Sequence, residues 1–524
     1  MSVININSSV SRMSPELWLK ILHHYVPSDA PTTIAIQSSK AELRPHILEY
    51  RWTLWAACQV SRQVGASATL CLYQAVLIND LRELLYFYRT LRTVPKLQTL
   101  VRSFSWTGLL PQSDAEDTEC VDLMPSLVPV FTSLPPPVTE KDTLLHQYLH
   151  GDNLAEFRAW QLLGVVLAII PKLTTLFLVL GRLMPGLRIQ PRLLYYEFGD
   201  RESTAEERAD LFKFRQEAYE FFAIRLLDPV LASAGYPFLP ELQILILDHI
   251  SNVPPIAFNN DGVIEDLQRL CPQLRYIQTK SRIHLANAVE EPACSTSMKS
   301  LLVRNQRFPA SDFPRMQVIY PNLISLRIVL LSGHETHPLF DSFKALTKLR
   351  HLQYLSMTTP HDITWAFLDR HPTMSPFLHQ MESLQHLRVD FIWLTPRNNP
   401  SRLLHIASLL PPSIKSLHLL DYWAIAMTST DRDKYPVFPD DMPALEFLHL
   451  MLENLLRSCT SMGLINLKEV KLSSIQYAKG RMLTIARASL SSLIRQFWQA
   501  GICLTMTGLE EARNEEEGWW LNLD

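Results

Sequence analysis

One hydrophobic spacing recurs along most of this chain. It is Leu-x-x-Leu-x-Leu, or a close substitute with another apolar residue. The copies begin at Leu97, Leu173, Leu242, Leu274, Met298, Leu323, Leu352, Leu384, Ile414, Leu445 and Leu467. From Leu242 onward, successive copies start 22 to 32 residues apart. Such a period is typical of repeats that contribute one strand and one helix each.

A proline stands two residues before seven of these copies, at positions 95, 171, 240, 272, 321, 412 and 443. Proline cannot continue a helix, and it favours an extended chain at the residue before it. The pattern resembles leucine-rich repeats, and the resemblance implies an α/β solenoid, an irregular horseshoe, over residues 76–510. The chain departs from that family after the strands, where Asn or Cys is usual. It has instead Gly181, Ile250, Leu331, Ile392, Tyr422 and Glu453.

Other segments fit this plan. We expect a strand at 75–78, helices at 81–92 and 154–170, and a last helix and strand at 482–500 and 502–506. Two long steps between copies predict insertions at about 108–155, which is acidic and proline-rich, and at about 181–235. Residues 1–12 are polar and predict a flexible tail. Residues 511–524 are acidic and aromatic, and we expect them to cap the last repeat.

The N-terminal segment, residues 13–75, predicts three short helices. Ser14, Pro15 and Glu16 supply a hydroxyl cap, a proline at the first helical position and an acid in the first turn. The helix after them is apolar on two faces. A second apolar helix is predicted at 54–62 and a third at 66–73. Together they carry more apolar surface than three short helices can bury among themselves, which predicts a protein partner.

This segment resembles an F-box, in the form found in filamentous fungi. The resemblance is carried by the run from Met13 to Leu17 with Ile21-Leu22, by Val60-Ser61-Arg62, and by Leu72-Tyr73. The usual Leu-Pro opening is Met13-Ser14 here, and the segment 27–49 is longer than in a compact F-box. The resemblance implies docking onto the Skp adaptor of an SCF-type cullin-RING ubiquitin ligase. Matching motif positions make Pro15, Leu17, Ile21, Leu22, Val60 and Leu72 the expected adaptor contacts.

The composition argues against several other functions. A net charge of −3 gives no electrostatic case for nucleic-acid binding. Seven scattered cysteines indicate reduced thiols and a cytoplasmic or nuclear protein. No apolar run is long enough to cross a bilayer. We find no phosphate-binding, dinucleotide, zinc or nucleophile motif, and His334 and His337 share no regular face. We therefore expect no catalytic residue, metal or cofactor.

The fifth position of each strand copy should point away from the buried leucines, onto the concave face. From Leu323 onward this position, with neighbouring outward positions, gives the expected substrate contacts. They are Arg327, Tyr354, Arg388, His418, Phe447, His449 and Lys471. Ser356 and His386 also fall on this face, and Trp393, Tyr422 and Trp423 follow strands. Basic and aromatic residues suit an acidic or phosphorylated peptide. An ordinary polar sheet face, with Trp393 and Trp423 packed under a loop, is an equally good explanation.

The sequence therefore predicts a substrate receptor of a ubiquitin ligase that performs no chemistry itself. Its F-box would bind the adaptor and its repeats would bind a protein substrate. The first alternative is a repeat scaffold outside ubiquitin chemistry. The second is an unrecognised hydrolase, for which a buried, partnered His or Asp with a shifted pKa in a deep pocket would be evidence.

Overall fold

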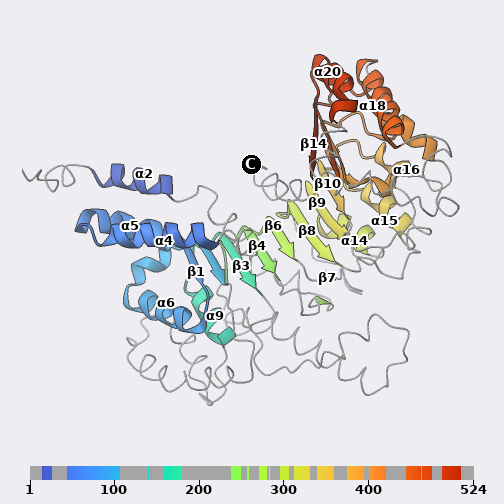
Figure 1. Cartoon of the computed structure of the whole chain (residues 1–524). Coiled ribbons are helices and arrows are strands. Elements are labelled where there is room, and N and C mark those ends of the chain that lie inside the picture. The colour runs from blue at the N-terminus through green and yellow to red at the C-terminus, as the bar shows by residue number, and fades with distance from the viewer. Residues whose placement is uncertain are drawn as a thin grey trace, which may run out of the picture. The chain divides into compact units, whose positions relative to one another are not determined.

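A computed structural model (Figure 1) describes most of the helices and strands of the chain. The described residues are 14–25, 44–106, 140, 143, 159–179, 238–248, 257–258, 271–279, 282–283, 296–305, 312–330, 339–358, 374–394, 400–420, 444–461, 463–474 and 487–508. The chain divides into two compact units. The N-terminal unit is Met1–Ala257 with Gly262–Ser281, and the C-terminal unit is Phe258–Asp261 with Arg282–Asp524.

Three helices open the N-terminal unit: α2 (Pro15–Tyr25), α4 (Arg44–Cys58) and α5 (Arg62–Gln74). The predicted cap of the first helix is confirmed, because the Leu17 N–H donates to Ser14 Oγ at 3.2 Å. The predicted second helix was placed too late, since α4 begins at Arg44 and already ends at Cys58. The reason is Ser61, whose hydroxyl accepts from the Val64 N–H at 3.2 Å and so caps the next helix.

These helices share a small apolar core. Leu22 of α2, Leu54 of α4 and Ala68 and Cys71 of α5 are buried in it. Leu72 is partly buried and packs against the same cluster. The three helices therefore form one packed group, and not isolated segments.

Helix α5 continues directly into β1 (Ala75–Ile78), the first of five described parallel strands in this unit. The others are β2 (Ser103–Trp106), β3 (Thr175–Val179), β4 (Ile244–Asp248) and β6 (Tyr276–Thr279), and they pair in that order. Between them lie α6 (Leu81–Thr93), the 3₁₀ turn η1 (Pro95–Thr99) and α9 (Ala159–Ala168). The short strand predicted at 75–78 and the helix predicted at 81–92 are confirmed.

The first leucine copy was placed four residues too early. Leu97 lies in η1, and the register pairs Phe104 and Trp106 with Leu176 and Leu178. The copy in β2 therefore starts at Val101, which is fully buried.

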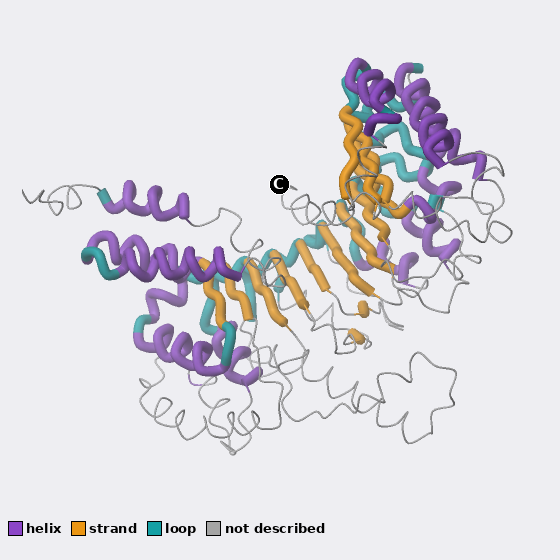
Figure 2. The backbone as a smooth tube through the Cα atoms, in the orientation of Figure 1, coloured by secondary structure: helices purple, strands orange, loops and turns teal. Residues whose placement is uncertain are grey.

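Seven described parallel strands form the C-terminal unit (Figure 2): β8 (Ser300–Asn305), β9 (Ser325–Leu330), β10 (Tyr354–Thr358), β11 (His386–Asp390), β12 (Ser416–Leu420), β13 (Glu469–Ser474) and β14 (Cys503–Gly508). Helices α14 (Asp312–Ile319), α15 (Leu339–Leu346), α16 (Ser375–Leu378), α18 (Ala444–Thr460) and α20 (Ser491–Gln499) lie along one side of these strands. The 3₁₀ segments η5 (Phe391–Trp393) and η6 (Pro400–Leu409) follow β11. Two short strands are β5 (Ala257–Phe258) and β7 (Arg282–Ile283).

The α/β class predicted from the leucine pattern is confirmed, and its physical basis is visible in each strand. In β10, Leu355 and Met357 are buried, as is Leu352 just before the strand, whereas the residues between them are half-buried. The last predicted strand is also confirmed, as β14. The predicted strand at Leu445 is wrong, because this copy lies inside helix α18 and β12 pairs directly with β13.

A side-chain ladder precedes the strands, where none was expected. Asn322, Ser383, Ser413 and Asn466 each stand one residue before the first position of a copy. Each donates to a backbone carbonyl in an earlier copy or in the residues just before it. The acceptors are, in the same order, the carbonyls of Thr296 (3.0 Å), Arg350 (2.6 Å), Leu384 (2.7 Å) and Pro412 (3.0 Å). These side-chain bonds therefore tie neighbouring repeats together just before the strands β9, β11, β12 and β13.

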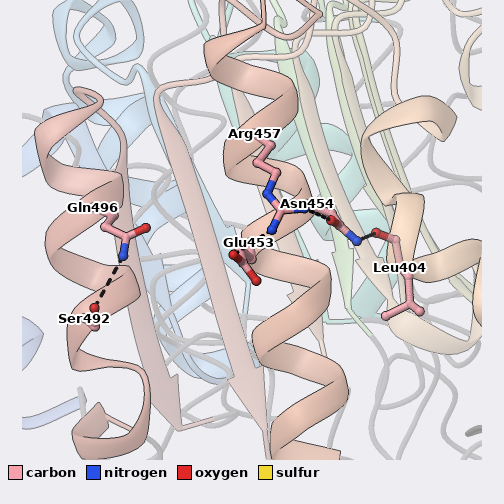
Figure 3. A network of polar contacts seen from close by, with 6 residues as sticks. All are labelled: Leu404, Glu453, Asn454, Arg457, Ser492 and Gln496. Carbon is pink, nitrogen blue, oxygen red and sulfur yellow. Dashed lines mark hydrogen bonds and ion pairs between the residues drawn. The ribbon is translucent and has the colours of Figure 1, made fainter.

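The helical side of the last repeats has its own polar contacts (Figure 3). On α18, Arg457 forms an ion pair with Glu453 at 2.8 Å, and Asn454 donates to the Leu404 carbonyl of η6 at 2.9 Å. Glu453 is thus a helix residue, and not one that follows a strand as predicted. Helix α20 ends at Gln499, and Gly501, just after its C-cap Ala500, has a φ of 76° that allows the left-handed turn into β14.

Several predicted segments lie outside the described residues. They are the tails 1–12 and 511–524, nearly all of the insertion at 108–155, the insertion at 181–235, and the pair His334 and His337. Within the described part of the chain, no helix has the length and apolar character needed to span a membrane.

Candidate interaction surfaces

The N-terminal helices expose part of the apolar stripe that the sequence marked for a partner. Leu17 is 45% exposed and Val60 is 62% exposed, while Ile21 is half-buried. Leu22 is only 5% exposed and Leu72 packs on the same core. Leu22 is therefore inside the helix group, and Leu72 is partly buried against its core. The adaptor contacts expected of these two leucines stay predictions. The side chain of Pro15 lies outside what the structure describes.

Two tryptophans on α4 were missed from the sequence. Trp52 is 64% exposed and Trp55 is 53% exposed, and their rings meet edge to face at 5.4 Å between centroids. Leu54 between them is fully buried. At 100° per residue, this places the tryptophans on the side of α4 away from the core. Exposed tryptophans are unusual and are frequent energetic centres of protein interfaces.

The helices are fixed to the first strand at two points. Helix α5 passes into β1 between Gln74 and Ala75 without a linker. In addition, Arg51 of α4 donates to the Leu77 carbonyl of β1 at 2.8 Å. The helices that carry the exposed residues are therefore held against the first strand.

The second candidate surface lies on the C-terminal unit, on the side of the strands away from the core. The strand register aligns Arg327, Ser356, Arg388, His418, Lys471 and Thr505 on six neighbouring strands. We call these six residues the basic row. The sequence placed Arg327, Arg388, His418 and Lys471 on one face at one position of the repeat, and the register confirms that placement. It does not by itself show what they bind.

A second row runs beside the basic row, two residues earlier in each strand. It aligns Ser325, Tyr354, His386, Ser416 and Glu469. The rings of Tyr354 and His386 stack with centroids 4.2 Å apart and planes 2° from parallel. Ser416 donates to Glu469 Oε2 at 2.8 Å. The predicted position of Tyr354 on this face is therefore also confirmed.

His418 lies at the centre of a buried polar chain. Its Nε2 is 2.7 Å from Ser473 Oγ, which is 2.8 Å from Thr507 Oγ1. Burial lowers the pKa of His418 well below its usual range, and the positive charges of Arg388 and Lys471 lower it further. The imidazole is consequently neutral at physiological pH.

His386 experiences the same effects more weakly. Burial and the charge of Lys415 lower the pKa of this half-buried histidine to about 4.

Two predicted contacts do not belong to this face. Phe447 and His449 lie on helix α18, and Phe447 is buried. Trp393 is also buried, in η5, where its ring meets Phe343 edge to face at 5.9 Å. It therefore has the packing role that the sequence left open. Tyr422 and Trp423 lie outside the described residues.

In the described segments, no three His, Cys, Asp or Glu side chains come together in a way that could hold a metal ion. His418 is buried, hydrogen-bonded to a serine and shifted in pKa, as a hydrolase histidine would be. A serine–histidine pair needs a carboxylate to stabilise the imidazolium, whereas the charges that shift His418 are two cations.

Both candidate surfaces are therefore identified from the sequence and the structure of this chain alone. A scan of the sequence against protein-family models found no match, and neither did a search of curated protein sequences.

Proposed function

We propose that this protein is the substrate-binding subunit of an SCF-type ubiquitin ligase, an F-box protein with leucine-rich repeats. The observation that carries the proposal is a group of three packed helices with exposed apolar residues, joined without a linker to parallel strands that repeat the leucine pattern. The helices would bind a Skp-type adaptor, and the strands would present a protein substrate. The chain would contribute proximity and no covalent step.

Two features support the adaptor half of this proposal. Among the residues that match the F-box pattern, Leu17 and Val60 are exposed and Ile21 is half-buried, so part of the motif is accessible. Trp52 and Trp55 add a large apolar area of the kind that anchors protein interfaces. We therefore assign Leu17, Ile21, Val60, Trp52 and Trp55 to the adaptor contact.

The test is co-expression of the full chain with a fungal Skp adaptor, followed by co-purification. Aspartate at Leu17 and Val60 together should abolish the complex, because two charges would be buried unpaired at the interface. Both positions are exposed, so the variant should retain its fold. Val318→Asp is the matched control, since Val318 is also an exposed valine (53%) but lies on α14 of the C-terminal unit.

A complex that forms with the wild type and with Val318→Asp, but not with the double variant, supports the receptor function. If a folded wild-type chain does not bind the adaptor, the chain is a repeat scaffold outside ubiquitin chemistry.

A further inference from the structure

The basic row has a regular spacing that a ligand can match. Neighbouring strands lie about 4.8 Å apart, so residues two strands apart are separated by about 10 Å. Arg327 and Arg388 are two strands apart, with Ser356 between them, and Lys471 follows after two more strands. A peptide in the polyproline II conformation advances about 3.1 Å per residue with three residues per turn, so residues three apart lie on the same side of it, about 9 Å apart.

The row also has one sign of charge. Its six residues include three cations and no carboxylate; of the cations Lys471 is buried, and the buried Asp390 stands two residues after Arg388 on β11. In the neighbouring row, Glu469 accepts the Ser416 hydroxyl. His418 lies between Arg388 and Lys471 in this row, and its pKa is lowered first by burial and then by these two charges. Arg327 and Arg388 are half-buried, so their charges reach the surface in a partly desolvated setting where they act strongly.

We propose that the basic row binds an acidic segment of the partner protein in the polyproline II conformation, which lies across the strands with an anionic side chain at every third residue. One anion would face Arg327 and the next Arg388, while Lys471 adds to the field. This inference rests on the proposed receptor function and gives its substrate a chemical class. The cations already interact within the chain, so the segment competes with those interactions, and its affinity depends on matching the spacing.

The probe is a fluorescent twelve-residue peptide with Asp at every third position among Gly and Ser. A second probe replaces Asp by phosphoserine, which separates phosphorylated from acidic substrates. A third has the same composition with its Asp residues adjacent, and a fourth has Asn in place of Asp. Binding to the full-length chain is measured by fluorescence anisotropy at two salt concentrations. We expect the spaced anionic peptides to bind best and to weaken with salt.

The variants test the row itself. Arg388→Glu should weaken binding of the spaced peptide about tenfold or more, because one charge-assisted contact becomes repulsive. Arg388→Gln removes the charge with less risk to folding and should have a smaller effect in the same direction. Arg495→Glu makes the same charge change on the exposed side of α20 and should bind like the wild type. Thermal unfolding of each variant establishes that it is folded.

The inference is overturned if folded Arg388→Gln binds the spaced peptide as well as the wild type, or if the Asn peptide binds equally. It is also overturned if only a chain with Glu515, Glu516 and Glu517 changed to Gln binds, because the row would then serve the chain's own acidic tail. Adaptor co-purification is scored on the same samples. If the wild-type chain forms the adaptor complex but does not bind the spaced peptide, this inference alone is refuted. If the folded wild-type chain does not form the adaptor complex, the proposed function is refuted.

Discussion

Replacing Gly65 by alanine should destabilise the N-terminal helices, although glycine to alanine usually stabilises a helix. Alanine gains about 1 kcal/mol over glycine in a helix interior. At Gly65, however, an added Cβ would lie 2.8 Å from the carbonyl oxygen of Cys58, at the end of α4. This neighbour is backbone and cannot rotate away. Restoring ordinary contact requires the end of α4 to shift by about half an ångström, an overpacking cost of about 1–3 kcal/mol.

The expected net change in the free energy of unfolding is a loss of about 1 kcal/mol. Hydrogen exchange detects it locally, as severalfold faster exchange of the amides of α4 and α5. The control is Gly501→Ala, where an added Cβ meets nothing within 4 Å but φ is 76°. This change should cost about 1–2 kcal/mol of backbone strain near α20 and β14, and leave α4 and α5 unchanged. Slower exchange in Gly65→Ala would refute the close approach of the two helices.

Two more predictions concern the C-terminal unit. The folded-state pKa values of His386 and His418 lie below the ordinary value of 6.5, so the unfolded chain takes up protons at a higher pH than the folded chain. The free energy of unfolding should therefore be highest above about pH 6.5 and should fall as the pH is lowered towards 4. His418→Gln should reduce that loss in thermal unfolding between pH 7.5 and 4.5, and an unchanged pH dependence would contradict the assignment. Ser413→Ala should cost about 1 kcal/mol, because it removes a partly buried bond to the preceding repeat. Ser408→Ala removes an exposed local bond and should leave the free energy of unfolding almost unchanged. Urea titration of both variants measures the difference.

The leucine spacing predicted most strands correctly because buried positions in a strand alternate. It failed at Leu445 because the same three leucines also begin a helical pattern. Phe447, Leu448, Met451, Leu452 and Leu455 are all buried along one face of α18. Pro443 gave no help, since proline precedes a helix as readily as it precedes a strand. The ambiguity is physical, because a short apolar run satisfies both periods until its continuation is considered.

The candidate surfaces were predictable to different degrees. The position of the basic row on one face could be predicted, because alternate residues of a strand point to opposite faces and the leucines occupy the buried one. On the N-terminal helices, the two apolar stripes of α2 did not reveal which one faces the core, and Leu22 proved to be inside. Trp52 fell outside the predicted helix because that helix was placed ten residues too late, whereas Trp55 lay inside it but was not singled out as a contact. With its true start, Trp52 and Trp55 stand opposite the buried Leu54 on a two-sided helix.

The edge strands of a parallel sheet have backbone groups that no neighbouring strand pairs. In this chain, an arginine side chain donates to one such carbonyl on β1 and another donates to one on β14. The Cys503 N–H of β14 donates to Lys468, so the alternate residues Leu504 and Met506 direct their backbone groups away from β13. There, Arg487 donates to the Met506 carbonyl at 2.8 Å. An edge protected in this way is a poorer template for adding another strand. At β1 the equivalent donor is Arg51, but this arginine comes from α4. The same bond therefore protects an edge and holds the exposed helices against the first strand. Under the proposed function, the adaptor would be bound at a fixed position relative to the strands of the N-terminal unit.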